Sequence, residues 1–258
     1  MAVLKDGSEV EDARLDRIPE FDERSRNFAV SAKVAEPRLH SMTWRIITSV
    51  PLDQGAEGAC VGFAVVHKLM ARPEEARFGR IDEATKYARE TIYWRAQQLD
   101  PWPGGAYPGA EKFYEGTSVL AGVKAAQEQG FFAEYRWSFS LQELIEGLVH
   151  VGPALMGLNW YRDCYHPNEK GHIRPSGTLM GGHAIIARAV RLRFLEGRQT
   201  ARFEDLDLER SEIVLRNSWG ANWGPLWGDC LVTLKDMEWW LTQYGEAVFS
   251  TGHLRRRT

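Results

Sequence analysis

The fold is predicted from the stretch Asp53-Gln54-Gly55-Ala56-Glu57-Gly58-Ala59-Cys60-Val61-Gly62-Phe63-Ala64. A glycine-rich turn there leads into an apolar run, which predicts a helix that begins at or near Cys60 and is buried nearly all round. The free N–H groups and the dipole at a helix N-terminus stabilise a thiolate. The stretch therefore favours a nucleophilic cysteine, although an inert buried cysteine fits the same pattern.

Helical patterns continue from this stretch toward residue 150. Apolar spacing predicts a second helix over residues 81–99 and two more that open near Thr117-Ser118 and at Ser140. After Gly152-Pro153 the pattern changes to that of strands. The predicted strands cover residues 154–160, 183–194, 213–216 and 231–234.

The separation of helices from strands argues for an α+β fold, with a helical lobe that faces a β lobe. We expect three parts. Residues 1–41 form a polar extension that wraps the domain or stays mobile, residues 42–150 form the helical lobe with the cysteine, and residues 151–258 form the β lobe.

Composition narrows the class of protein. The chain has 258 residues, of which 44% are hydrophobic and 26% charged, as expected of a soluble globular protein. A net charge of -3 does not favour nucleic acid or a membrane surface as a partner. We see no secretory signal or membrane span, and three cysteines make no disulfide framework, so we expect a cytoplasmic protein. The composition leaves the oligomeric state open.

Two more motifs carry possible catalytic chemistry. In Gly181-Gly182-His183-Ala184, a histidine opens a strand behind glycines that let another backbone come close, although a structural histidine fits equally. In Asn217-Ser218-Trp219-Gly220, the Asn217 side chain can fix the tautomer of an imidazole, although a strand-end turn with core tryptophans fits as well. Gln54, six positions before Cys60, can donate its amide N–H to an oxyanion.

The order Gln, Cys, His, Asn resembles the papain family of cysteine peptidases, family C1. The resemblance covers residues 42–248 or so, is strongest around Asn217, and is greatest to bacterial and phage-type members. It implies a two-lobed papain-like fold, with the active-site cleft between a helical lobe and a β-barrel-like lobe. It also implies a peptide or protein substrate held in an extended conformation, and no cofactor or metal.

The resemblance also implies a role for each motif residue. Cys60 attacks the peptide carbonyl through a thiolate, and His183 acts as general base and then general acid. Asn217 orients His183, and Trp219 shields that hydrogen bond from water. Gln54 and the Cys60 N–H stabilise the oxyanion. Gly182 and Trp219 are expected to line the substrate site.

Three features depart from the family pattern. Val61 stands where a tryptophan usually follows the nucleophile, and Glu57 replaces a disulfide cysteine. Glu57 puts a carboxylate near the site, where it either raises the thiol pKa or favours basic substrates. No inhibitory propeptide pattern is recognisable in residues 1–41, so we do not expect control by a classical pro-domain.

Two other functions fit parts of the sequence. The first is a catalytically silent papain-fold protein kept for binding or assembly, for example in a phage particle. The second is thiol chemistry on another acyl group, as in amidases or transglutaminase-like enzymes. A zinc site built from Cys164, Cys230, His166 and His172 is not favoured, because their spacing matches no compact ligand pattern.

Overall fold

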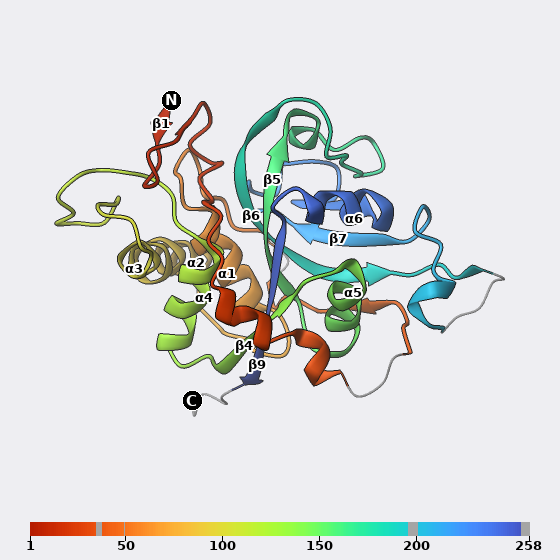
Figure 1. The fold of residues 1–258 in the computed structure, drawn as a ribbon. Coiled ribbons are helices and arrows are strands. Elements are labelled where there is room, and N and C mark those ends of the chain that lie inside the picture. The colour runs from red at the N-terminus through yellow and green to blue at the C-terminus, as the bar shows by residue number, and fades with distance from the viewer. Residues whose placement is uncertain (35–37, 49, 196–200, 254–258) are drawn as a thin grey trace.

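The computed structural model describes residues 1–34, 38–48, 50–195 and 201–253. Helices α1 to α4 gather on one side of the molecule and a large sheet with helices α5 and α6 lies on the other (Figure 1). This α+β arrangement confirms the predicted fold class. Helix α1 spans Cys60–Met70, and α4 spans Val119–Glu128. Between them lies one continuous helical stretch, made of α2 (Ile81–Lys86), a π-helical part (Tyr87–Tyr93) and α3 (Trp94–Leu99).

Helix α1 is buried along its whole length, as its apolar sequence predicts. Gly62 lets it pack against the neighbouring π-helical part, because a Cβ at this position would lie 2.3 Å from the carbonyl oxygen of Ala88. Helix α4 begins where predicted, with the Ser118 hydroxyl accepting a hydrogen bond from the N–H of Ala121 at 3.0 Å. These contacts fix the helix that carries the predicted nucleophile.

The sheet has seven strands in the order β4-β9-β5-β6-β7-β8, and β3 pairs with β6 on the side of this path. Every strand pair is antiparallel. The strands are β3 (Met42–Thr43), β4 (Phe132–Ser138), β5 (Ala154–Tyr161), β6 (Leu179–Arg191), β7 (Glu212–Arg216), β8 (Asp229–Thr233) and β9 (Glu246–His253).

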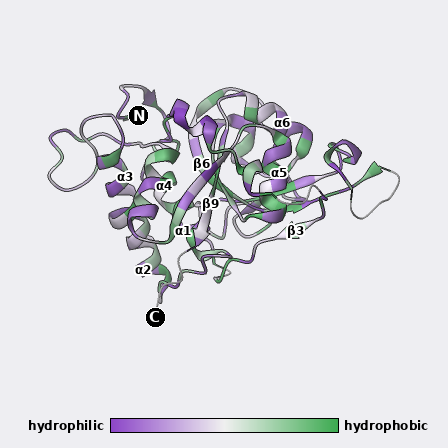
Figure 2. Cartoon of the chain, turned by 60° about the horizontal axis from the view of Figure 1, so that its bottom comes forward, coloured by the Kyte–Doolittle hydropathy of each residue, from purple (hydrophilic) through white to green (hydrophobic). Residues whose placement is uncertain are grey.

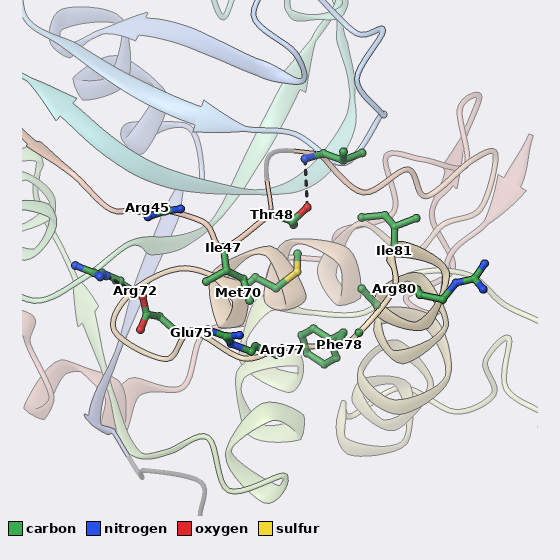
Figure 3. A pocket seen from close by; sticks show the side chains of 13 residues that line it. Arg45, Ile47, Thr48, Met70, Arg72, Glu75, Arg77, Phe78, Arg80 and Ile81 are labelled. Atoms are coloured by element: carbon green, nitrogen blue, oxygen red, sulfur yellow. Dashed lines mark hydrogen bonds and ion pairs between the residues drawn. The ribbon is translucent and has the colours of Figure 1, made fainter. Parts of the chain in front are cut away.

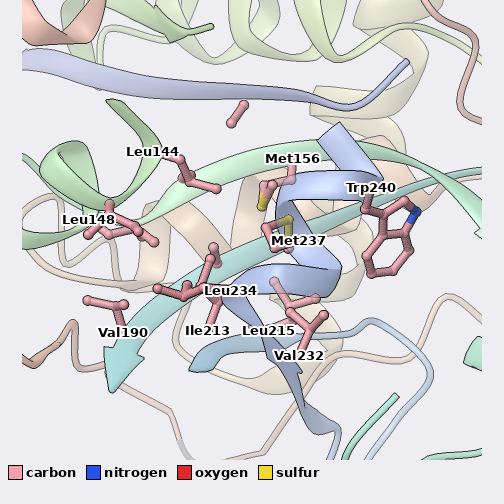
Figure 4. Packing of buried hydrophobic residues seen from close by; sticks show 14 of the residues in the cluster. Leu144, Leu148, Met156, Val190, Ile213, Leu215, Val232, Leu234, Met237 and Trp240 are labelled. Atoms are coloured by element: carbon pink, nitrogen blue, oxygen red, sulfur yellow. The ribbon is translucent and has the colours of Figure 1, made fainter. Parts of the chain in front are cut away.

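Strands β5 and β6 are buried on both faces and separate two cores. Leu155 and Ile186 pack with the helical lobe, whereas Met156 and Ile185 pack on the opposite face. That opposite face is covered by α5 (Leu141–His150) and α6 (Leu234–Thr242), whose apolar residues meet the sheet in Figure 4. In Figure 2 both helices carry apolar and polar residues, as expected of helices with one face in the core.

Several strands differ from the sequence prediction. Strands β4 and β9 were not predicted, although they pair along most of their length. The short strand predicted over residues 231–234 ends earlier, because the Thr233 hydroxyl accepts the N–H of Asp236 at 3.0 Å and so caps helix α6. Strand β6 begins at Leu179, ahead of the two glycines, and ends at Arg191, before the predicted end.

The N-terminal residues wrap the domain. A two-stranded sheet joins β1 (Ala2–Val3) to β2 (Glu9–Val10), and two short 3-10 helices follow at Glu23–Asn27 and Val30–Lys33. Leu15, Val30 and Leu39 are fully buried in the core beneath α5 and α6. The described residues of this extension, 1–34 and 38–41, therefore contribute to the hydrophobic core as well as to the surface.

Candidate active site

Helix α1 presents Cys60 as its first residue, and the side chain is fully buried. The Cys60 sulfur accepts a hydrogen bond from the backbone N–H of Ala184 at 3.2 Å. Ala184 directly follows His183 in β6, so this contact brings the predicted nucleophile against the strand of the predicted base. Two motifs that are far apart in the sequence therefore meet where the lobes join.

His183 and Asn217 form a direct hydrogen bond, with 2.8 Å between the Nε2 and Oδ1 atoms. Asn217 follows β7, and its Oδ1 also accepts the backbone N–H of Ser218 at 2.8 Å, which fixes the amide orientation. The Nδ1 atom of His183 has no hydrogen-bond partner within the described part of the chain. The imidazole is thus held at Nε2, and the Arg14 backbone lies near enough to the ring to oppose the lowering of its pKa.

Aromatic rings enclose this pair. The ring centroids of Trp219 and His183 are 4.9 Å apart, and those of Trp160 and His183 are 4.8 Å apart. Trp219 is only 7% exposed, and its indole packs against the imidazole. Burial lowers the pKa of His183 to about 4, although the hydrogen bond to Asn217 acts in the opposite direction.

Gln54 joins the nucleophile segment to the asparagine segment. Its Oε1 accepts the Ser218 hydroxyl at 2.7 Å, and its Nε2 donates to the carbonyl of Glu57 at 2.8 Å. The same Nε2 lies 3.5 Å from the carbonyl oxygen of Arg14. The amide of Gln54 therefore faces a backbone carbonyl that belongs to the N-terminal part of the chain.

Residues 12–18 lie across the predicted site, and we call them the covering segment. The Cys60 thiol donates a hydrogen bond to Oδ1 of Asp16 at 2.9 Å. The N–H of Arg17 donates to the carbonyl of Gly182 at 3.1 Å, and the N–H of Ile18 donates to that of Thr117 at 3.0 Å. The covering segment is thus bound to both lobes and sits on the nucleophile.

Burial, together with the carboxylate beside the sulfur, favours the protonated form of Cys60 in this arrangement. Burial raises the pKa of the Cys60 thiol well above its ordinary value, and the nearby Asp16 carboxylate raises it further. Burial also raises the pKa of Asp16 to about 7, opposed by its hydrogen bond from Cys60. A neutral thiol is a poor nucleophile, so this is a closed form of the site.

Glu57 lies elsewhere than its sequence position suggested. Its carboxylate pairs with Arg89 and is about half exposed, while its backbone carbonyl binds Gln54. The carboxylate that contacts the thiol is Asp16, which no motif singled out. Asp16 is one of four aspartates in a mostly polar extension, and nothing in the sequence marks it as the one that contacts the thiol.

Gly182 has the close approach that its motif predicted. A Cβ at this position would lie 2.0 Å from the carbonyl oxygen of Arg17, which no side chain can accommodate. The glycine therefore allows an extended chain to lie directly against β6. In this structure that chain is the covering segment.

The other two cysteines lie in environments that disfavour a reactive thiolate. Cys164 and Cys230 are buried, unpaired and raised in pKa by burial. The part of the chain that the structure describes contains no group of three or more His, Cys, Asp or Glu side chains arranged to hold a metal. Nor is any described helix long and apolar enough to cross a membrane.

A separate pocket of about 690 Å³ lies at the opposite end of α1 (Figure 3). Met70 and Phe78 are among the apolar residues that line it, and Arg45, Arg72 and Arg77 are among the charged ones. None of the predicted site residues lines this pocket. We therefore assign it no part in the chemistry at Cys60.

Comparison with known proteins identifies the fold. No family model matches the sequence, and no curated protein matches it. Among solved structures, xylellain, a cysteine protease from Xylella fastidiosa, matches with a TM-score of 0.61 and 16% identity, over 96% of this chain and 99% of that one. The Carica candamarcensis cysteine protease CMS1MS2, solved in complex with E-64, matches with a TM-score of 0.51 and 16% identity, over 83% and 99% of the two chains. The chain therefore has the papain-like fold of the C1 cysteine proteases.

Proposed function

We propose that the protein is a cysteine peptidase that hydrolyses peptide bonds in peptide or protein substrates. One observation carries the proposal. A buried cysteine at a helix N-terminus lies against the strand of a histidine that is hydrogen-bonded to an asparagine, within a papain-like fold. This arrangement supplies a nucleophile, a base and an orienting group.

In the proposed reaction, His183 takes the thiol proton of Cys60 and the thiolate attacks the substrate carbonyl. Nδ1 is the nitrogen that takes it, since Nε2 is bound to Asn217. The protonated imidazole then gives this proton to the leaving amine, which breaks the C–N bond and leaves a thioester on Cys60. A water molecule deprotonated by His183 hydrolyses the thioester, and the thiol is restored.

Gln54 is proposed to stabilise the negative oxygen of the tetrahedral intermediates, together with the backbone N–H of Cys60. The support is the position of the Arg14 carbonyl oxygen, which lies 3.5 Å from the Nε2 of Gln54. A carbonyl of an extended chain beside Cys60 can therefore reach the Gln54 amide.

Activity requires the covering segment to move. Asp16 occupies the hydrogen-bonding position at the sulfur and raises the thiol pKa. We propose that residues 12–18 leave the lobe junction before a substrate binds. The closed form then represents a resting state of the enzyme.

The test is covalent trapping under reducing conditions with an epoxysuccinyl peptide, read by intact mass. Wild type and Asp16→Ala are compared, with Cys60→Ala and His183→Ala placed in each background. We expect one adduct, formed faster by Asp16→Ala and lost in both catalytic variants. If folded Asp16→Ala forms no adduct, the peptidase proposal is wrong.

The closed site favours one alternative, a catalytically silent papain-fold protein that binds or assembles with other proteins. In the described arrangement the thiol is buried, protonated and hydrogen-bonded to Asp16. Under this alternative the covering segment never leaves the junction. Protection of the Arg17 and Ile18 amides from hydrogen exchange, as slow as that of the core strands, would support it.

A further inference from the structure

The side chain of Arg17 enters the protein directly beside the nucleophile. Arg17 follows Asp16, which contacts Cys60, and its backbone is held by the carbonyl of Gly182. The Arg17 side chain is only 1% exposed although it belongs to a surface-crossing segment. A long cationic side chain is thus inserted into the lobe junction next to the predicted site of bond cleavage.

Two acceptors bind the Arg17 guanidinium. Its Nε lies 2.8 Å from Oε1 of Glu246, and its Nη2 donates to the same oxygen and, at 2.9 Å, to the carbonyl of Tyr244. Glu246 is the first residue of β9 and pairs with Gly157 of β5. The floor of the Arg17 site is therefore the end of the β5–β9 strand pair, inside the sheet.

Gly157 provides the space for this contact. A Cβ on Gly157 would lie 2.4 Å from Nε of Arg17 and 2.6 Å from Oε1 of Glu246. It would also lie 2.9 Å from Val119 of the helical lobe. Any larger residue at position 157 would displace either the guanidinium or the carboxylate.

Glu246 is left in an unfavourable state when Arg17 leaves. Its side chain is 13% exposed, and burial raises its pKa while the charge of Arg17 lowers it. Among the described residues, Arg17 is the one cation within ion-pair distance of Glu246. An unpaired carboxylate at such a site is costly, so the vacated site favours another cation.

We infer that Glu246, Gly157 and the Tyr244 carbonyl form a specificity site for a basic side chain of the substrate, which Arg17 occupies in the closed form. The inference rests on the proposed peptidase function. Arginine is favoured over lysine, because its planar fork donates to both acceptors at once while an ammonium is a point charge. A rival explanation is that the Arg17–Glu246 pair only tethers the covering segment.

The test uses the full chain with Arg17→Ala, which vacates the site, and a set of peptide electrophiles. Each probe carries arginine or norleucine at the first, second or third residue from the reactive group, with alanine elsewhere. The rate of Cys60 labelling is measured by intact mass. At one of the three positions, we expect the probe with arginine to label Cys60 about 10- to 100-fold faster than the probe with norleucine. This ratio corresponds to the free energy of a hydrogen bond to a charged group.

Arg17→Ala/Glu246→Gln should reduce this preference to within about threefold, because no carboxylate then faces the guanidinium. The double variant leaves neither charge buried alone, so its folding is not compromised by an unpaired partner. Glu20→Gln in the Arg17→Ala background is the matched control. It removes a nearby carboxylate that does not contact Arg17, and it should keep the arginine preference.

A binding measurement separates failure of this inference from failure of the proposed function. Peptide amides with arginine or norleucine are titrated into Arg17→Ala/Cys60→Ala by calorimetry. Labelling of Cys60 without a preference for arginine would contradict the specificity site but would still support the proposed peptidase function. Binding of the arginine peptide that requires Glu246, without labelling by any probe, supports the site and overturns the peptidase. If neither labelling nor binding distinguishes arginine, the pair is only a tether.

Discussion

The His183–Asn217 pair and the covering segment are both buried at the junction of the lobes, but different contacts hold them there. The pair is a neutral hydrogen bond enclosed by Trp160 and Trp219. The covering segment is held by backbone hydrogen bonds and also by ionisable side chains, including Asp16 on the thiol and Arg17 on Glu246. The His183–Asn217 pair is uncharged at neutral pH because burial lowers the pKa of His183 to about 4, whereas the contacts of the segment depend on which of its side chains are ionised. Under the proposed function, the pair is the fixed part of the site and the covering segment is the part that has to leave.

Removing the fixed part should have the largest effect. Cys60→Ala and His183→Ala, each in the Asp16→Ala background, are expected to lower the rate of peptide hydrolysis by about 10³-fold or more, because a nucleophile and its base act as one unit. The double variant should be no worse than either single variant. Additive losses would contradict a coupled pair.

The orienting residue should matter less than the base. Asn217→Ala removes the acceptor of Nε2 and leaves the imidazole free to rotate. We expect kcat to fall by about 10- to 100-fold, part of what acid–base catalysis supplies. Asn217→Gln is the matched variant. An unchanged kcat in both, with normal thermal stability, would mean that the enclosing rings alone hold His183.

The fixed part is also the part that the sequence predicts well. Cys60, His183 and Asn217 each lie in a local pattern, and the helix from Cys60 follows from an apolar run. The prediction fails where contacts are non-local. Strand β4 finds its partner β9 more than a hundred residues later, and the two strands carry no common signal. Arg17 and Glu246 are 229 positions apart, so neither marks the other in the sequence.

The position of Asp16 could not be predicted for the same reason. The extension up to residue 41 was recognised, but no propeptide motif was found in it and control by such a segment was not expected. The structure nonetheless lays residues 12–18 over Cys60, held by backbone hydrogen bonds to Gly182 and Thr117 that any sequence can make. Backbone pairing leaves little trace in side-chain patterns.

Removing the contact of the covering segment with the thiol should increase the reactivity of Cys60. Asp16→Ala deletes the acceptor of the thiol and the charge that raises its pKa, so Cys60 labelling at pH 7 is expected to rise by about 10- to 100-fold. Asp12→Ala is the matched control on the same segment, because Asp12 contacts Arg14 and Tyr165 rather than the thiol. An equal rise in both variants would show general loosening instead of a specific contact.

The stability of the folded, covered protein should also depend on pH, because Asp16 titrates. Its pKa rises from 3.8 to about 7 on burial, so the folded protein holds a proton that the unfolded chain releases between these values. The Asp16 contribution to stability is therefore fully present below pH 4 and is lost as pH rises toward 7, by at most about 1.4 kcal/mol per unit. His183, whose pKa falls to about 4, acts in the opposite direction.

Urea unfolding of wild type and Asp16→Asn between pH 4 and 7 isolates the aspartate, because both proteins contain His183. We expect the stability of wild type relative to Asp16→Asn to decrease steadily as pH rises. A difference that does not change with pH would mean that Asp16 is not a buried acid in solution.

Glu57 should give the smallest effect, and it tests the comparison most directly. Glu57 belongs to the nucleophile motif, yet its carboxylate pairs with Arg89 at the surface, whereas Asp16 belongs to no motif and contacts the thiol. An exposed ion pair contributes about 0.2–1 kcal/mol, so Glu57→Gln should leave the pH profile of Cys60 labelling unchanged and its rate within about twofold of wild type. A rise in the labelling rate as large as that expected for Asp16→Ala would mean that Glu57 turns toward the sulfur once the covering segment has left. Position in the motif, rather than contact in the closed form, would then determine which carboxylate acts on the nucleophile.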